Sequence, residues 1–234
     1  MPPGGPSSEP VAPPRQRWRL VVARSADAPR LAGRELSDAW ELAIEATGLP
    51  IHRPAGRAHG RIAFGASLPV GIAAERELVD IFMAEPVPLW RLREALVGAL
   101  PDGWRLVDVF DVWVGAPPLA GRVNGAEYRI ELGGATDPEA VAGAARSLLT
   151  ARTLPRVRMR GESPVPYDLR PLLADVTVTE PGPPVVLRIR GRIHPELGTG
   201  RPDEVVAALG DALGREMEVR GIVRERLIVA DEPA

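Results

Sequence analysis

The residues best suited to chemistry in this sequence are arginines that alternate with other residues along two short stretches. They are Arg156, Arg158, Arg160, Arg188, Arg190 and Arg192. Because side chains alternate between the two faces of a strand, each group of three should lie on one face of its strand. Arginine binds phosphate oxygens in a two-pronged geometry. Six arginines on one open sheet face would therefore bind phosphate groups or RNA.

A solvated sheet face is the alternative interpretation of the same pattern. Its arginines would pair with Glu127 and Glu131 of the neighbouring strand, since cross-strand ion pairs are common. The predicted face also lacks aromatic residues for base stacking, which argues more against sequence-specific RNA recognition than against backbone binding. Convergence of both arginine groups and His59 on one concave face would favour ligand binding. Placement of the two groups on opposite sides would argue against it.

His59 and Arg61 form the other candidate binding surface. His52 and His59 lie seven positions apart in an arginine-rich loop, and the like charge opposes a metal cation. An anion-binding loop fits these residues better, with a plain solvated loop as the alternative. His194, followed by Pro195, is expected to be a turn residue.

Composition excludes several classes of function. The 234 residues include no cysteine, and all 29 basic residues are arginine. Cysteine ligation, thiolate catalysis, Schiff-base chemistry and a lysine-dependent phosphate loop are therefore excluded. The sequence contains no complete catalytic motif, so we expect no catalytic residue, no metal and no cofactor. The net charge of −2 means that any RNA binding must be local.

Nothing in the sequence indicates a membrane protein. No apolar run approaches 18 residues, and the N-terminus lacks the basic start and apolar centre of a signal peptide. A cytoplasmic location is expected.

The order of predicted elements indicates the fold class. The first half should hold strands at 17–22, 61–64, 77–85 and 104–114 and helices at 33–47 and 88–100. The second should hold strands at 127–132, 156–160, 176–179, 185–192 and 218–229 and helices at 137–151 and 202–213. The order βαββαβ is typical of a ferredoxin-like fold. We therefore predict an α+β protein of two tandem ferredoxin-like halves with antiparallel sheets.

The expected domain boundaries follow from composition. Residues 1–15 are rich in proline and glycine and should form a disordered tail. The first half would span 16–115 and the second 126–230, joined by a linker at 116–125. The last residues, 231–234, should fray.

Several short stretches carry a resemblance to a known family. They are Gly48-Leu49-Pro50, His59-Gly60-Arg61-Ile62-Ala63-Phe64, Leu68-Pro69-Val70-Gly71, Glu77 with Asp80-Ile81, Asp168-Leu169-Arg170-Pro171-Leu172 and Gly200-Arg201-Pro202-Asp203-Glu204-Val205. In this order, over about residues 17–229, the chain resembles the radical SAM-linked protein family of unknown function. Members of that family are encoded beside, or fused to, a cobalamin-binding-type radical SAM protein. The resemblance implies a bacterial protein whose gene neighbours serve RNA metabolism.

The first helix departs from that family's pattern. The family usually starts this helix with a Ser-His-Leu-Asp-like stretch, where this chain has Ala32-Gly33-Arg34-Glu35. The arginines expected at its end are missing from residues 42–47. A basic surface on this helix is thus absent, whereas His59 and Arg61 remain.

These observations lead to three hypotheses. The first is a non-enzymatic accessory protein that works with a radical SAM partner or in RNA metabolism and binds RNA through its arginine strands. The second is a protein–protein adaptor without nucleic-acid contact. The third is an enzyme that uses His59, although no partner residue for His59 can be named from the sequence.

Overall fold

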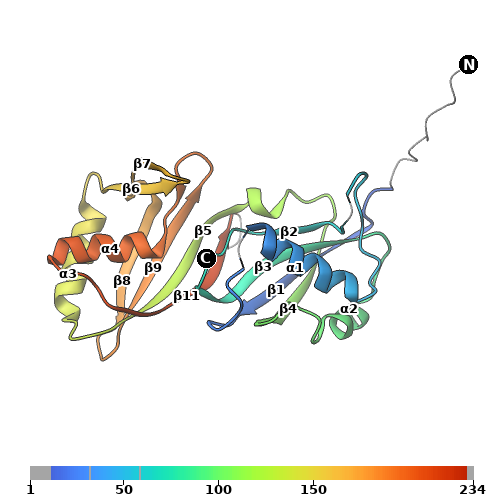
Figure 1. Cartoon of the computed structure of the whole chain (residues 1–234), viewed down its shortest axis with the longest axis horizontal. Helices are drawn as coiled ribbons and strands as arrows, with labels where there is room; N and C mark the ends of the chain where they lie inside the picture. The colour runs from blue at the N-terminus through green and yellow to red at the C-terminus, as the bar shows by residue number, and fades with distance from the viewer. Residues whose placement is uncertain (1–11, 32, 58, 231–234) are drawn as a thin grey trace, which may run out of the picture.

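The computed structural model describes residues 12–31, 33–57 and 59–230, except for the side chain of Arg160. Within these residues, nine strands form one large, mostly antiparallel sheet, and four α-helices lie together on one of its sides (Figure 1). We call the other side the open side. The α+β class is confirmed. No helix in the described ranges is long and apolar enough to cross a membrane.

The first half of the sheet has the strand order β4-β1-β3-β2, with all neighbours antiparallel. Its elements are β1 (Gln16–Arg24), α1 (Gly33–Ala46), β2 (Ile62–Phe64), β3 (Ala73–Met83), α2 (Leu89–Leu96) and β4 (Trp104–Val112). Alternate residues of β1 and β3, such as Leu20 and Val79, pack with Trp40 and Ile44 of α1 in one buried cluster. The period-two and helical apolar patterns therefore meet in a single core.

The second half has the strand order β8-β9-β5-β11. Its elements are β5 (Val123–Leu132), α3 (Pro138–Thr150), β8 (Leu173–Glu180), β9 (Val185–His194), β10 (Gly198–Thr199), α4 (Pro202–Leu213) and β11 (Val219–Val229). The side chain of Asp137 caps α3 by accepting from the Glu139 N–H, and Gly214 ends α4 in a left-handed conformation with φ of 65°. These local signals explain why both helices were predicted within two residues.

The two halves share one sheet, so the prediction of two separate sheets is wrong. β11 and β3 pair in parallel, with Val223 opposite Ala73 and Arg224 opposite Ala74. Ala73 and Ala74, which lie before the predicted start of β3 at 77, supply this pairing. At the junction, the buried Arg224 donates from Nε to Glu77 at 2.6 Å and binds the backbone carbonyl of Ser67. The ferredoxin-like assignment of each half stays a prediction.

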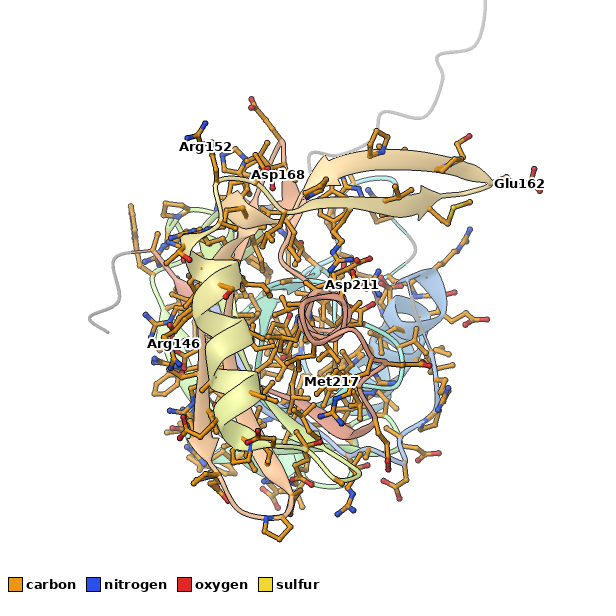
Figure 2. The ribbon with its side chains drawn as sticks, turned by 90° about the vertical axis from the view of Figure 1, so that its left-hand side faces the viewer. Arg146, Arg152, Glu162, Asp168, Asp211 and Met217 are labelled. Carbon is orange, nitrogen blue, oxygen red and sulfur yellow. The ribbon has the colours of Figure 1, made fainter. Side chains whose placement is uncertain are left out.

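A separate two-stranded hairpin consists of β6 (Pro155–Arg160) and β7 (Ser163–Asp168), followed by the 3-10 turn η2 (Arg170–Leu172). The strand predicted at 156–160 exists, but its placement in the main sheet was wrong. The hairpin extends on the helix side of the sheet, above α4, with Glu162 at its tip (Figure 2). β7 was not predicted, because Pro164 and Pro166 obscure the strand pattern.

The linker crosses the open side of the first half. It contains the 3-10 turn η1 (Leu119–Gly121), and its Ala116 carbonyl accepts a 2.8 Å hydrogen bond from Arg17 Nη1. Of the tail predicted at 1–15, residues 1–11 lie outside the described part, as do 231–234. Residues 12–15 contact the first half: the Arg15 N–H donates to the Met83 carbonyl at 2.9 Å.

Candidate functional site

The open side of the second half carries a row of arginines along β9. Arg188, Arg190 and Arg192 are exposed there, while Leu187 and Ile189 are buried on the helix side. The alternation in the sequence therefore gave the correct side for this group.

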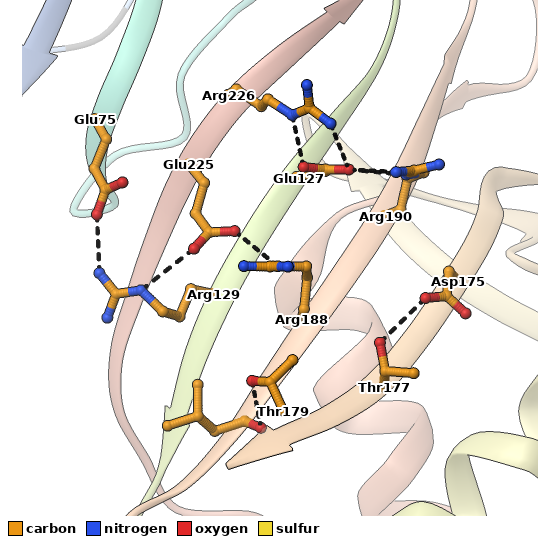
Figure 3. Close-up of polar contacts among 11 residues, drawn as sticks. Glu75, Glu127, Arg129, Asp175, Thr177, Thr179, Arg188, Arg190, Glu225 and Arg226 are labelled. Atoms are coloured by element: carbon orange, nitrogen blue, oxygen red, sulfur yellow. Dashed lines mark hydrogen bonds and ion pairs between the residues drawn. The ribbon is translucent and has the colours of Figure 1, made fainter. Parts of the chain in front are cut away.

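Carboxylates from neighbouring strands pair with two of these three arginines (Figure 3). Arg188 donates to Glu225 of β11 at 3.0 Å, and Glu225 also lies 3.5 Å from Arg129 of β5. Arg190 donates from Nε to Glu127 of β5 at 3.0 Å. Much of this face therefore matches the alternative interpretation of the sequence, in which the arginines form ion pairs on a solvated sheet face.

Glu127 is the most strongly perturbed carboxylate of this face. Arg226 of β11 donates to it at 2.7 Å on the side opposite Arg190. The hydrogen bonds from Arg226, with those from Arg190, lower the pKa of Glu127 to about 2, against the opposing effect of burial. Glu127 therefore remains ionised and holds Arg190 in a fixed orientation.

Arg192 differs from its two neighbours on β9, because its hydrogen-bond acceptors are backbone carbonyls. Its Nη1 donates to the Pro171 carbonyl at 3.0 Å and to the Leu173 carbonyl at 3.1 Å. Among the described residues, Nε and Nη2 of Arg192 have no hydrogen-bond acceptor and no carboxylate forms an ion pair with this side chain. Its position is therefore fixed while its charge is not neutralised.

Arg190 and Arg192 line a cavity of about 420 Å³ at the end of β9, which we call the β9 pocket. Its lining residues are Asn124, Gly125, Pro171, Ala174, Arg190, Gly191, Arg192, Ile193, His194 and Ile228. None of these described lining residues is acidic. Two acidic residues lie opposite Arg190 in register: Glu127 of β5, which pairs with it, and Asp175 of β8, which accepts from Thr177. Arg192 is therefore the arginine that gives the pocket its unbalanced positive charge, since Glu127 pairs with Arg190.

His194 and Asn124 carry the polar side chains of the pocket that sequence reasoning did not propose. The Nδ1 atom of His194 accepts from the backbone N–H groups of Glu196 and Leu197, both at 3.2 Å, so the neutral ring carries its proton on Nε2. The signal for His194 was present, since residues 188, 190, 192 and 194 continue one period-two series. The prediction ended the strand at 192, whereas β9 extends to His194.

The other arginine strand lies on the opposite side of the sheet. Arg156 of β6 pairs with Asp211 of α4, and the guanidinium carbon of Arg158 lies 5.1 Å from the Tyr167 ring centroid. For Arg160 the structure describes only the backbone, which pairs with Ser163. The expected face with six arginines is therefore wrong, because β6 belongs to the hairpin and not to the main sheet. By the criterion given above, this separation argues against a ligand-binding face shared by the two arginine groups.

His59 and Arg61 line a different groove of about 890 Å³, between α1 and the loop before β2. Its charges are mixed, since Asp38 and Glu41 line it as well. His59 Nδ1 lies 3.8 Å from Glu41 Oε2 and 3.6 Å from Glu45 Oε1, which supplies the carboxylate neighbours that the sequence could not name. These distances exceed hydrogen-bond length. Arg61 lies over the Phe82 ring at 4.0 Å. No group of metal-ligating residues occurs in the described part of the chain.

Residues 17–209 match the model of a family described as an uncharacterized protein conserved in bacteria (DUF2344). The chain belongs to this family. The matched region includes β2 to β10, the hairpin, the groove at His59 and every lining residue of the β9 pocket except Ile228. No curated protein matches the chain. Among solved structures, a chain of a crystal structure of a Cbf5-Nop10-Gar1 complex is similar at 10% identity and a TM-score of 0.43. The alignment covers 89% of this chain and 57% of that chain.

Proposed function

We propose that this chain is a non-enzymatic cytoplasmic accessory protein that binds phosphate groups of RNA in the β9 pocket. The observation that carries the proposal is a cavity without acidic lining residues in which Arg190 and Arg192 are both held in place. The proposed binding surface is smaller than the surface predicted from the sequence, because it leaves out β6.

The chemistry of the two arginines supports this proposal. Glu127 and two backbone carbonyls already fix the guanidinium groups, so a phosphate would bind without a large cost of ordering long side chains. The remaining N–H groups of Arg192 can donate charge-assisted hydrogen bonds to phosphate oxygens. RNA supplies such phosphates at regular spacing, so a single strong pocket would serve as one contact among several.

The proposal also includes a protein partner, a radical SAM enzyme. The resemblance to the radical SAM-linked family supports a protein that works beside a radical SAM enzyme, and the pocket supports a role in presenting or retaining RNA. An association between the two proteins would join these roles in one complex.

RNA binding can be tested with a matched control on the same strand. We would measure the affinity for labelled tRNA and rRNA fragments by fluorescence anisotropy at low salt. Arg190→Ala with Arg192→Ala should weaken binding by about tenfold or more, as expected for lost charge-assisted contacts of about 1.5–3 kcal/mol. Arg188→Ala, two residues away on the same face but outside the pocket, should change it by less than about twofold. Equal effects of both variants would contradict the proposal, as would no binding by the wild type.

An adaptor function is the second candidate, and the hairpin favours it. Val157 and Met159 of β6 are 60% and 64% exposed, and the register places them opposite Pro166 and Pro164 of β7. Apolar side chains of this kind on a projecting element are common at protein contacts. A radical SAM partner that binds the wild type but not Met159→Asp, without any RNA binding, would favour the adaptor over the RNA-binding protein.

A further inference from the structure

A cavity of about 520 Å³ lies where the two halves of the molecule meet, and we call it the junction cavity. Residues of α1, β2, β3 and β4 line it from the first half, and Ile193 of β9 and Thr199 of β10 line it from the second. Its volume is in the range of small-molecule sites, which are frequent between two parts of a fold. Its aromatic walls lie on the helix side of the sheet, whereas Arg190 and Arg192 lie on the open side, so this cavity is separate from the β9 pocket.

Two aromatic rings form fixed walls of the junction cavity. Phe64 and Trp104 both pack edge-to-face against the buried Trp40, with ring centroids 5.8 and 5.3 Å from it. Both rings line the cavity and are only partly buried, so a ligand in the cavity can reach them. Rings of this kind can contact another flat ring, an aliphatic group or a cation.

The charges around the junction cavity argue against a charged ligand. Glu77 is the acidic residue in its described lining, and Arg224 donates to both of its oxygens. A second buried guanidinium, that of Arg24, lies with its carbon 5.9 Å from the centroid of the Trp104 ring. The two arginines outweigh the one carboxylate, which opposes a cation in the cavity. Neither arginine lines the cavity, so an anion would contact no cationic donor there.

Two hydroxyl groups in the lining are available to a ligand. Ser67 and Thr199 line the cavity from different halves, and neither hydroxyl has a hydrogen-bond partner within the described part of the chain. Ser37, the third hydroxyl residue of the lining, donates to the Gly33 carbonyl at 3.3 Å. An aliphatic ligand would leave the two available hydroxyls unused. A heteroaromatic ring offers a flat apolar face to the aromatic walls and polar atoms at its edge to the hydroxyls.

We infer that the junction cavity is a binding site for a flat, uncharged heteroaromatic ring. The ring packs against Phe64 and Trp104, and its edge forms hydrogen bonds with Ser67 and Thr199. Such a ligand contacts both halves and stabilises their junction, where β3 and β11 pair through only two residues in each strand. This inference goes beyond the proposed function, because it concerns the other side of the sheet and requires no phosphate group.

The test measures the binding of three small probes to the full-length chain by saturation-transfer difference NMR. Adenine is a flat, uncharged ring with a hydrogen-bonding edge, cyclohexanol is an aliphatic alcohol, and tetramethylammonium is a cation. Adenine should bind with a Kd of about 1 mM or below, as expected for a ligand of about ten non-hydrogen atoms. The other two probes should bind at least about tenfold more weakly, because each lacks the flat ring or carries the opposed charge.

Variants of two lining residues locate the binding. Ala120 is an exposed linker residue, so Ala120→Phe can fill the cavity and should weaken adenine binding by about tenfold or more. Ala120→Ser, at the same position, is the matched control and should change the affinity by less than about twofold. Thr199→Val keeps the shape and removes one hydroxyl, which should weaken adenine binding by about two- to tenfold even if Ala120→Phe folds poorly. Arg190→Ala with Arg192→Ala should leave adenine binding unchanged.

The outcomes separate this inference from the proposed function. Absence of adenine binding would overturn the inference, as would equally tight binding of cyclohexanol. Adenine binding that neither Ala120→Phe nor Thr199→Val weakens would place the ligand elsewhere and overturn it too. Loss of adenine binding in the double arginine variant would assign the ring to the β9 pocket, which also contradicts the inference. A lack of RNA binding beside adenine binding in the cavity would contradict only the proposed function.

Discussion

Each half of the sheet has a carboxylate that lies between two arginines on the open side, and the two clusters differ mainly in what covers them. In the first half, Asp80 accepts from Arg17 and Arg19, and the exposed fractions of the three side chains are 0%, 2% and 8%. In the second half, Glu127 is 8% exposed but Arg190 is 45% exposed. The same ionic chemistry is therefore buried in one half and open to solvent in the other.

The linker accounts for this difference. It runs across the first half, where the carbonyls of Ala116 and Pro117 accept hydrogen bonds from Arg17. Nothing comparable covers β9 in the described part of the chain, and its arginines keep N–H groups free. The buried cluster is thus suited to stability, and the open one is suited to binding.

The largest expected effect is at the buried cluster. Asp80→Asn leaves two buried guanidinium groups without a counter-charge, which should lower the free energy of unfolding by about 3–5 kcal/mol. Urea denaturation followed by circular dichroism measures this change. Asp111→Asn, at an exposed position that contacts Gln16, is the control and should cost less than about 0.5 kcal/mol. A small effect of Asp80→Asn would remove the distinction between the clusters.

The open cluster should respond more weakly to the matching change. Glu127→Gln should lower the free energy of unfolding by about 1–2 kcal/mol, because water can hydrate the half-exposed Arg190 once the charge is gone. The same denaturation experiment applies. A loss as large as that of Asp80→Asn would mean that exposure does not separate the two clusters.

Low pH should abolish the contribution of Glu127 to the free energy of unfolding. Its pKa falls from 4.5 to about 2 in the folded chain, so the unfolded chain binds more protons between these values. The stability from Glu127 is complete above about pH 4.5 and is lost as the pH falls toward 2. The difference in unfolding free energy between the wild type and Glu127→Gln should therefore shrink over this range. A constant difference would contradict the pKa and its cause.

The smallest expected effect is on the stability of Arg188→Ala. Its partner Glu225 lies on the open side and keeps its ion pair with Arg129, so the loss should stay below about 0.5 kcal/mol. Thermal unfolding at low and high salt would detect a larger role, which would show that Arg188, Glu225 and Arg129 stabilise the sheet as one unit.

The sequence predicted local structure better than it predicted which strands lie together. α4 was predicted with the observed bounds, since Pro202 begins it and Gly214 ends it. Alternation also put Arg188, Arg190 and Arg192 on the open side. The side of β6 could not be obtained in this way, because an alternating strand has the same pattern in a hairpin as in a sheet.

Parts of the site were beyond sequence reasoning for a similar reason. A cavity of about 520 Å³ between the two halves joins Phe64 of β2, Trp104 of β4 and Ile193 of β9, which are far apart in the chain. Their proximity depends on the pairing of β11 with β3, a contact of two residues in each strand. Only His194 had an unused signal, in the period-two series that leads to it.

The salt dependence of RNA binding tests the central claim most directly. Each phosphate contact contributes a slope of about −0.7 to a plot of log affinity against log salt concentration for single strands. Arg190→Ala with Arg192→Ala should make this slope shallower by about 1, whereas Arg188→Ala should leave it unchanged. An unchanged slope in the double variant, or an equal change in Arg188→Ala, would contradict the assignment of binding to the β9 pocket.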